Sequence, residues 1–203
     1  MADDHVLLLE GMRQLLEPEF EVIGMCSDGR TLLRTAEQLR PDVVLLDISM
    51  PLLNGLDAAM HLRKVLPSVQ IVFVTMHADA EYVRAAFRAG GAGYLVKRCA
   101  GAELVTAVRQ VLRGQTYVSS RVQGGEGGTL DVSAQSTDPT LTLRQREVLQ
   151  LVAEGYTDKE IASLLFVSDK TVEFHKASIR KQLGLRSTAE MVRYAIKHGL
   201  TSA

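Results

Sequence analysis

The sequence has no tryptophan, and aromatic residues make up only 5% of its 203 positions. It has two cysteines, Cys26 and Cys99, which lie far apart and form no metal-binding or redox motif. No apolar run approaches the roughly 20 residues that span a bilayer, and no basic leader follows Met1. These absences argue against a disulfide scaffold, a zinc module and a membrane protein. Isolated thiols are typical of a reducing compartment, so we expect a cytoplasmic chain without membrane association.

The composition is typical of a soluble globular protein, with 46% hydrophobic and 23% charged residues. The length allows two small domains or one larger domain. The net charge of −1 is unevenly distributed, because residues 141–203 carry 10 Lys+Arg against 7 Asp+Glu, whereas residues 1–140 carry 13 against 17. The basic C-terminal part weakly indicates an anionic partner.

A stretch rich in glycine and small polar residues divides the chain, from Gly124 to Pro139. Such a stretch has little to bury and is typical of a linker. We therefore predict an N-terminal domain over 1–114, a linker over 115–140 and a C-terminal domain over 141–203.

Before the linker, short apolar runs alternate with amphipathic segments. The predicted strands cover 20–25, 42–46, 70–74 and 93–96, and the predicted helices cover 6–17, 30–39, 55–65, 79–89 and 101–113. Strands that are apolar at nearly every position are typical of parallel sheets buried on both faces. The alternation therefore predicts a doubly wound α/β domain with a parallel sheet.

After the linker, the pattern is helical throughout. Capping boxes are predicted at Thr142–Gln145, Thr157–Glu160 and Ser187–Glu190, and Ser168 is a further helix N-cap candidate. Two of the helices, 158–166 and 169–183, are separated by a short turn, which is the spacing of a helix-turn-helix. This part is predicted to be a small all-α domain.

Three predicted strands end in a chemically useful side chain, namely Asp47, Thr75 and Lys97, and Asp3 and Asp4 precede the first helix. In an open parallel sheet these groups gather at one edge. Clustered carboxylates need a cation, and oxygen ligands suit Mg²⁺. Asp47 is then a candidate nucleophile toward a phosphoryl group, with Lys97 neutralising its oxygens and Thr75 donating a hydrogen bond. Each residue alone has a simpler role as a turn residue, cap or surface charge, but their coincidence at the strand ends favours a site.

Residues 2–113 resemble a response-regulator receiver domain. The matching motifs are Ala2-Asp-Asp-His5, Leu46-Asp-Ile-Ser-Met-Pro51 with Gly55, Val74-Thr75 and Gly93-Tyr-Leu-Val-Lys97. The resemblance implies a flavodoxin-like fold in which a histidine kinase phosphorylates Asp47. It further implies Mg²⁺ binding by Asp3, Asp4, Asp47 and the carbonyl of Ser49, a switch made of Thr75 and Tyr94, and dimerisation through the face of the fourth helix, fifth strand and fifth helix.

The sequence departs from the receiver pattern at its start, where the apolar first strand before the acidic pair is missing. A central strand buries several side chains, each contributing roughly 1.5–3 kcal/mol. We therefore expect Asp3 and Asp4 to lie on a frayed terminus with impaired metal binding. Two explanations stay open: either the natural start lies upstream, which we favour because the rest of the pocket is intact, or the receiver is atypical.

Residues 141–200 resemble the LuxR-type helix-turn-helix domain of the NarL/FixJ regulators. The matching motifs are Leu141-Thr-Leu-Arg-Gln-Arg-Glu147, Ala153-Glu-Gly155, Lys159-Glu-Ile-Ala162, Val167-Ser168, Lys170-Thr-Val172, His175 and Leu183-Gly-Leu-Arg-Ser187. Helical spacing places Val172, Ile179 and Leu183 on a stripe that faces the core. The resemblance implies double-stranded DNA as partner, with Glu173, Phe174 and Ala177 reading bases. The predicted phosphate contacts are Lys170, Thr171, His175, Lys176, Arg180 and Lys181.

The sequence thus predicts a DNA-binding transcription regulator that phosphorylation of Asp47 controls and that binds DNA as a homodimer. An alternative is a phosphorylation-independent regulator with a truncated receiver. A second alternative, an enzyme that uses the Asp/Mg²⁺ site, would need a further general acid near Asp47 and a substrate cap, and the sequence indicates neither. We therefore expect no enzymatic activity.

Overall fold

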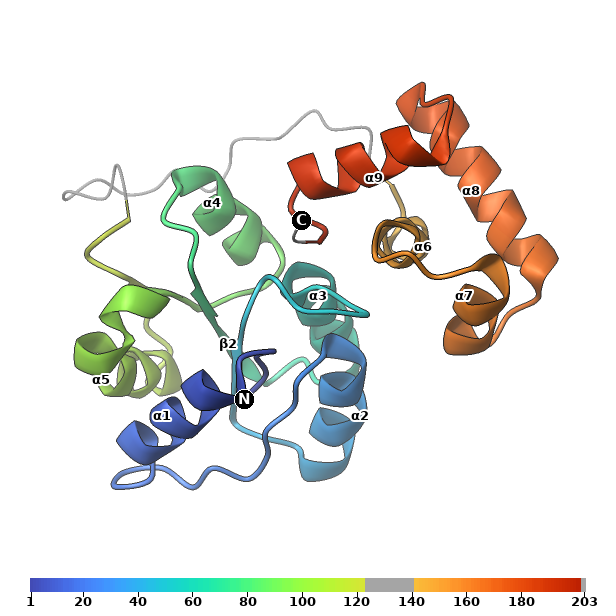
Figure 1. Ribbon diagram of the computed structural model, residues 1–203. Helices are drawn as coiled ribbons and strands as arrows, with labels where there is room; N and C mark the ends of the chain where they lie inside the picture. Colours follow the sequence, from blue (N-terminus) through green and yellow to red (C-terminus); the bar gives the residue numbers. More distant parts are fainter. Residues whose placement is uncertain (123–140, 202–203) are drawn as a thin grey trace.

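The computed structural model describes residues 1–122 and 141–201 of the chain, which form an α/β part and an all-helical part (Figure 1). The α/β part contains a parallel sheet in the order β1-β2-β3-β4. Its strands are β1 (Val43–Leu46), β2 (Gln70–Thr75), β3 (Gly93–Val96) and β4 (Tyr117–Val118). The first three match predicted strands, and the parallel doubly wound architecture is confirmed.

The sheet continues into the segment that the sequence analysis assigns to the linker. Tyr117 and Val118 pair with Gly93 and Tyr94, and Val122 is buried in the core below them. The predicted boundary at residue 114 is therefore too early. The sequence does not indicate β4, because a two-residue edge strand is too short to show a periodic pattern.

Helices cover both faces of the sheet. They are α1 (Val6–Leu16), α2 (Gly29–Leu39), α3 (Gly55–Val65), α4 (Ala80–Arg88) and α5 (Ala100–Leu112), with a 3₁₀ turn, η1, at Lys97–Cys99. Val72 and Val74 belong to the core under α1 and α5, whereas Ile71 and Phe73 belong to the core under α2 and α3. Successive side chains of a strand point to opposite faces, which explains why β2 is apolar at each position from Ile71 to Val74.

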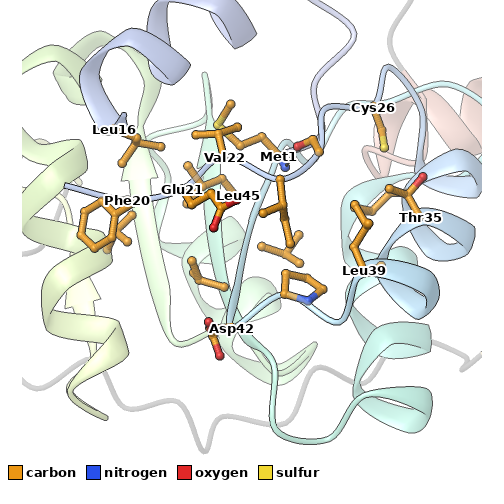
Figure 2. Close-up of a pocket in the computed structure, with 18 of the residues that line it drawn as sticks. Met1, Leu16, Phe20, Glu21, Val22, Cys26, Thr35, Leu39, Asp42 and Leu45 are labelled. Carbon is orange, nitrogen blue, oxygen red and sulfur yellow. Dashed lines mark hydrogen bonds between the residues drawn. The ribbon is translucent and has the colours of Figure 1, made fainter. Parts of the chain in front are cut away.

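The predicted strand at 20–25 does not form. Directly after this stretch, Cys26 forms an isolated parallel bridge to Ala2, and Ala2 forms a second bridge to Leu46. An extended segment becomes a strand only when a neighbour supplies hydrogen-bond partners along its length. For segment 20–25 (Figure 2), the neighbouring extended segment consists of residues 1–3, so the pairing is limited to the residues that these three can reach.

The predicted frayed terminus is also wrong. The Ala2 amide donates to the Leu45 carbonyl at 2.8 Å, and the Asp3 amide donates to the Cys26 carbonyl at 3.1 Å. Both residues are buried. Two neighbouring chain segments therefore hold the start of the chain in an extended conformation, which fixes Asp3 at the carboxyl edge of the sheet.

The all-helical part contains α6 (Leu143–Ala153), α7 (Asp158–Leu165), α8 (Asp169–Leu183) and α9 (Thr188–Lys197). The capping boxes of Thr142 and Thr157 are complete. The third is not, because Glu190 accepts from the Arg186 amide at 2.6 Å instead of from Ser187. Val172 and Ile179 are fully buried, and Leu183 is half-buried against the same core, as the stripe predicted. No helix in the described ranges is long and apolar enough to cross a membrane.

Candidate functional site: phosphoacceptor pocket and DNA-reading helix

Asp47 follows the last residue of β1 and lies in a buried cluster of opposite charges. The ammonium of Lys97, which follows β3, contacts Asp47 Oδ2 at 2.8 Å and Asp3 Oδ2 at 2.7 Å. The three side chains are at most 6% exposed. The structure therefore brings together three of the predicted site residues from three segments that are distant in the sequence.

Burial sets the charge balance of this cluster. Burial raises the pKa of Asp47 above its usual value, although the hydrogen bond from Lys97 partly offsets the shift. For Lys97, burial lowers the pKa, but the hydrogen bonds to Asp3 and Asp47 outweigh it and leave the pKa above its ordinary value. The lysine is therefore cationic at neutral pH and balances part of the negative charge of the two carboxylates.

The acidic groups form a possible cation site. Ligand atoms of Asp3, Asp4, His5 and Asp47 all lie within 4.8 Å of one another. Asp4 is exposed and pairs with the His5 ring at 2.7 Å. Three carboxylates that converge on one point fit a divalent cation that prefers oxygen ligands. His5 lies next to these carboxylates. It belongs to the Ala2-Asp-Asp-His5 motif, but the sequence did not predict a role for it.

A histidine that the sequence analysis missed connects the remaining predicted residues. The amide of His77 donates to Thr75 Oγ1 at 3.4 Å, and its carbonyl accepts from the Tyr94 hydroxyl at 3.0 Å. Its ring lies 3.3 Å from Ser49 Oγ and stacks on Tyr82 with centroids 3.9 Å apart. Position 77 follows the β2 strand end by two residues, which is the signal that could have identified it.

Tyr94 is fully buried, so its ring already points into the protein. Burial raises the pKa of its hydroxyl well above the ordinary value for tyrosine, which keeps the hydroxyl protonated and able to donate. Thr75 is also buried, beside the end of β2. The two predicted switch residues thus share His77 as a hydrogen-bond neighbour.

The predicted DNA-reading helix, α8, is open on its outer side. Figure 1 shows it on the side of the helical part that faces away from the sheet. Glu173, Phe174 and Ala177 are exposed, and Phe174 is 69% exposed. The predicted phosphate contacts Lys170 and Lys181 are exposed as well, and Thr171, His175, Lys176 and Arg180 are half-buried.

Two of the predicted phosphate contacts are modified by their surroundings. Lys176 is paired with Asp158 at 2.6 Å, so part of its charge is already compensated. Burial, helped by the nearby Arg144, lowers the pKa of His175 below 6.5. The lowered pKa favours the neutral form of the His175 ring at pH 7.

A polar junction joins the two parts of the chain between α6 and the loop after β1. The Gln150 side chain accepts from the Asn54 amide at 2.8 Å and donates to the Met50 carbonyl at 3.0 Å. Glu154 accepts from the Leu52 amide at 3.1 Å, and the Leu52 side chain packs on the core of the helical part. This loop begins directly after Asp47, so the junction starts a few residues from the phosphoacceptor candidate.

Charged pairs extend the junction on both sides. Arg146 contacts the buried Asp57 at 2.7 Å, and Glu147 contacts His61 at 2.9 Å and Arg30 at 3.3 Å. Burial would raise the pKa of Glu147, but the hydrogen bonds from His61 and Arg144 outweigh it and leave this pKa below its usual value. The junction therefore joins the two parts through hydrogen bonds and ion pairs as well as through Leu52.

The comparisons with known proteins agree with this division. Residues 1–109 match the response regulator receiver domain family, and residues 139–195 match the LuxR family of bacterial regulatory proteins. The chain therefore belongs to the transcriptional response regulators that combine a receiver domain with a LuxR-type DNA-binding domain. In this family, control by phosphorylation is the norm.

Two curated relatives are similar over nearly their full length. The transcriptional regulatory protein MctR of Rhizobium johnstonii is 38% identical over 204 residues, which cover 100% of this chain and 94% of MctR. The oxygen regulatory protein NreC of Staphylococcus aureus is 38% identical over 210 residues, covering 98% of this chain and 97% of NreC. Both comparisons include the two domains.

Solved structures of response regulators are also similar to this chain over nearly its full length. The RcsB response regulator of Salmonella typhimurium is 28% identical with a TM-score of 0.61, and the match covers 95% of this chain and 93% of RcsB. A structure of an RcsB–DNA complex is also 28% identical, with a TM-score of 0.57 over 95% of this chain and 94% of that chain. The predicted family and fold are thus confirmed.

Proposed function

We propose that Asp47 accepts a phosphoryl group from the phosphohistidine of a sensor kinase and that the resulting charge change controls DNA binding by α8. The observation that carries this proposal is the convergence of Asp47, Asp3 and Lys97 within 2.8 Å contacts at one sheet edge. Phosphoryl transfer depends mainly on positioning and on neutralising charge, and this cluster supplies both.

Phosphoryl transfer to Asp47 forms one bond to phosphorus and breaks another. A carboxylate oxygen of Asp47 attacks phosphorus, the bond from phosphorus to the donor nitrogen breaks, and that nitrogen keeps the electron pair. Lys97 neutralises a phosphoryl oxygen, and the Thr75 hydroxyl donates a hydrogen bond to another. Asp3, Asp4, Asp47 and the Ser49 carbonyl would hold Mg²⁺, which when bound supplies the charge that lets phosphate approach a carboxylate cluster.

For the DNA step, we propose that α8 enters the major groove of double-stranded DNA. Phe174 and Ala177 pack against apolar edges such as a thymine methyl, and Glu173 accepts from a cytosine amino group. Lys170, Thr171, His175, Lys176, Arg180 and Lys181 contact phosphates. Two copies of the chain then bind paired half-sites, because phosphorylation favours a homodimer.

The direct test is phosphorylation of the full chain with a small-molecule phosphodonor and Mg²⁺, followed by intact-mass measurement. We expect one phosphoryl adduct, its loss in Asp47→Asn, and its retention in Asp42→Asn. Asp42 is a matched control because it lies at the opposite end of β1. An adduct that persists in Asp47→Asn would mean that another residue accepts the phosphoryl group.

A measurement of DNA affinity distinguishes the proposed function from the phosphorylation-independent alternative. The proposal expects tighter DNA binding by the phosphorylated protein than by Asp47→Asn treated in the same way. Equal affinities, measured at one fixed salt concentration because salt dominates such binding, would favour the alternative.

A further inference from the structure

Two aromatic side chains of the helix-turn-helix are open to solvent. Phe166 is 95% exposed and Phe174 is 69% exposed, whereas every other phenylalanine and tyrosine within 1–122 and 141–201 is buried or half-buried. Phe174 lies in the N-terminal half of α8, and Phe166 lies in the turn between α7 and α8. The two exposed rings are therefore neighbours of the half-helix that is proposed to read bases.

The fold itself gives no reason for a phenylalanine at position 166. The residue ends α7, and its backbone is left-handed, with a φ of 54° and a ψ of 47°. Glycine and asparagine are the usual residues in this conformation, because a Cβ atom crowds the following carbonyl oxygen. Phe166 therefore costs stability in the turn, and its exposed ring gains nothing from burial within the chain.

Hydrogen bonds fix the main chain on both sides of this ring. The Val167 amide donates to the Ala162 carbonyl at 3.0 Å. The Arg144 guanidinium donates to the Leu165 carbonyl at 2.6 Å, just before Phe166. The ring thus extends from an ordered turn, so a partner that covers it would have few further groups to immobilise.

The turn leads into the end of α8 that would approach DNA. Ser168 caps this end by accepting from the Thr171 amide at 3.2 Å. Asp169 and Lys170 are both exposed here, so their charges largely cancel. In a helix-turn-helix complex the second helix lies in the major groove and the first crosses the backbone, so the turn between them lies beside the sugars and phosphates at the groove edge.

We propose that Phe166 is a further DNA contact, and that its ring packs on deoxyribose carbons at the edge of the major groove. The inference rests on the proposed function, since it needs α8 in that groove. An apolar contact suits this end of α8, because neighbouring charges of opposite sign give little net attraction for phosphate. Sugar carbons are present at every base pair, so Phe166 adds affinity without adding base preference.

The test compares Phe166→Asn with Phe166→Leu in the full chain. Asparagine suits a left-handed residue but removes the ring, whereas leucine keeps an apolar side chain. Arg40→Asn is the matched control, because Arg40 is also exposed and left-handed, with a φ of 47°, but ends α2 in the receiver. The probe is a fluorescein-labelled duplex that the unchanged protein selects from a randomised pool, and fluorescence anisotropy measures its binding over a salt series.

We expect Phe166→Asn to weaken binding of this duplex by about tenfold, and Phe166→Leu to weaken it by less than about threefold. The slope of log K against log salt should stay the same in Phe166→Asn, because no charge is removed. The thermal midpoint of this variant should not fall, since asparagine relieves the left-handed turn. Arg40→Asn should bind the duplex as the unchanged protein does.

Unchanged duplex affinity in Phe166→Asn would overturn the proposal. If this variant bound the duplex normally but activated or repressed less in a reconstituted transcription assay, the ring would contact a protein of the transcription machinery instead of DNA. A protein that selects no duplex at all would contradict the proposed function together with this contact, so the two failures are distinguishable.

Discussion

Lys97 is the residue on which the electrostatics of the proposed phosphoacceptor pocket depend. Its ammonium is the cation that contacts both Asp3 and Asp47 inside the protein. Removing one partner of a buried ion pair leaves an uncompensated charge and typically costs about 3–5 kcal/mol. Lys97→Met should therefore lower the free energy of unfolding by about that amount in chemical denaturation without Mg²⁺.

A divalent cation should partly restore this variant, because it can balance the same carboxylates. We expect saturating Mg²⁺ to stabilise Lys97→Met more than it stabilises the unchanged protein. Lys170→Met is the matched control, since Lys170 is exposed and a surface substitution changes stability by less than about 0.5 kcal/mol. Equal Mg²⁺ effects on all three proteins would contradict the idea that the cation and Lys97 balance the same carboxylates, and no Mg²⁺ effect on any of them would contradict the proposed metal site.

Individual side chains of α8 should divide into base readers and phosphate contacts. Lys181 is exposed, so Lys181→Ala should reduce the slope of log K against log salt by about 0.9. Lys176 is paired with Asp158, so Lys176→Ala should reduce the slope less. Fluorescence anisotropy over a salt series measures both slopes, and a larger change in Lys176→Ala would reverse this assignment.

At the scale of elements, the loop between β1 and α3 (48–54) is packed against its own strand end. A Cβ added to Gly55 would lie within 1.9 Å of the Asp47 carbonyl oxygen. Gly55→Ala must therefore displace the start of α3 or Asp47 itself, and we expect lower stability together with slower phosphoryl uptake, measured by denaturation and intact mass.

The control for this element is a glycine with open space around it. A Cβ at Gly101 in α5 meets nothing within 4 Å, so Gly101→Ala should raise stability by roughly 0.5–1 kcal/mol, as expected for glycine in a helix. If Gly55→Ala were phosphorylated at the same rate as the unchanged protein, the close packing at Gly55 would not affect phosphoryl transfer to Asp47.

Secondary-structure elements were predictable where a segment carries a clear apolar run or a helical period of its own. Three of the four predicted strands form, and α8 buries Val172 and Ile179 as its period requires. The prediction failed at 20–25, because a strand also needs a neighbour, and at Tyr117–Val118, because two residues carry no period. Asp47, Asp3 and Lys97 were predictable from strand ends, whereas the position of His77 depends on tertiary contacts with Ser49, Tyr82 and Tyr94.

At the scale of the whole molecule, the junction between the two domains depends on a buried polar side chain. Gln150 is fully buried, and it bonds Asn54 and Met50 of the receiver. Replacing it with leucine leaves the Asn54 amide without its partner, which typically costs about 1–3 kcal/mol. Gln150→Leu should therefore shift the domains toward an undocked arrangement.

This shift is measurable as a larger radius of gyration in small-angle X-ray scattering. The matched control is Gln145→Leu, because Gln145 is buried on the same helix but bonds Ser178 and Gln182 within the helical part. An equal expansion in both variants would mean that the helical part itself had loosened.

DNA affinity then shows what docking controls. Phe174 and its neighbours on α8 are exposed in the docked arrangement, and the junction uses α6 instead. If docking does not cover the reading face, Gln150→Leu should bind a single half-site with unchanged affinity, because the same side chains are accessible in both states. Its affinity for a paired site should differ, since pairing depends on how the receiver positions two helical domains. Tighter binding to the single half-site would instead show that docking hinders α8 directly.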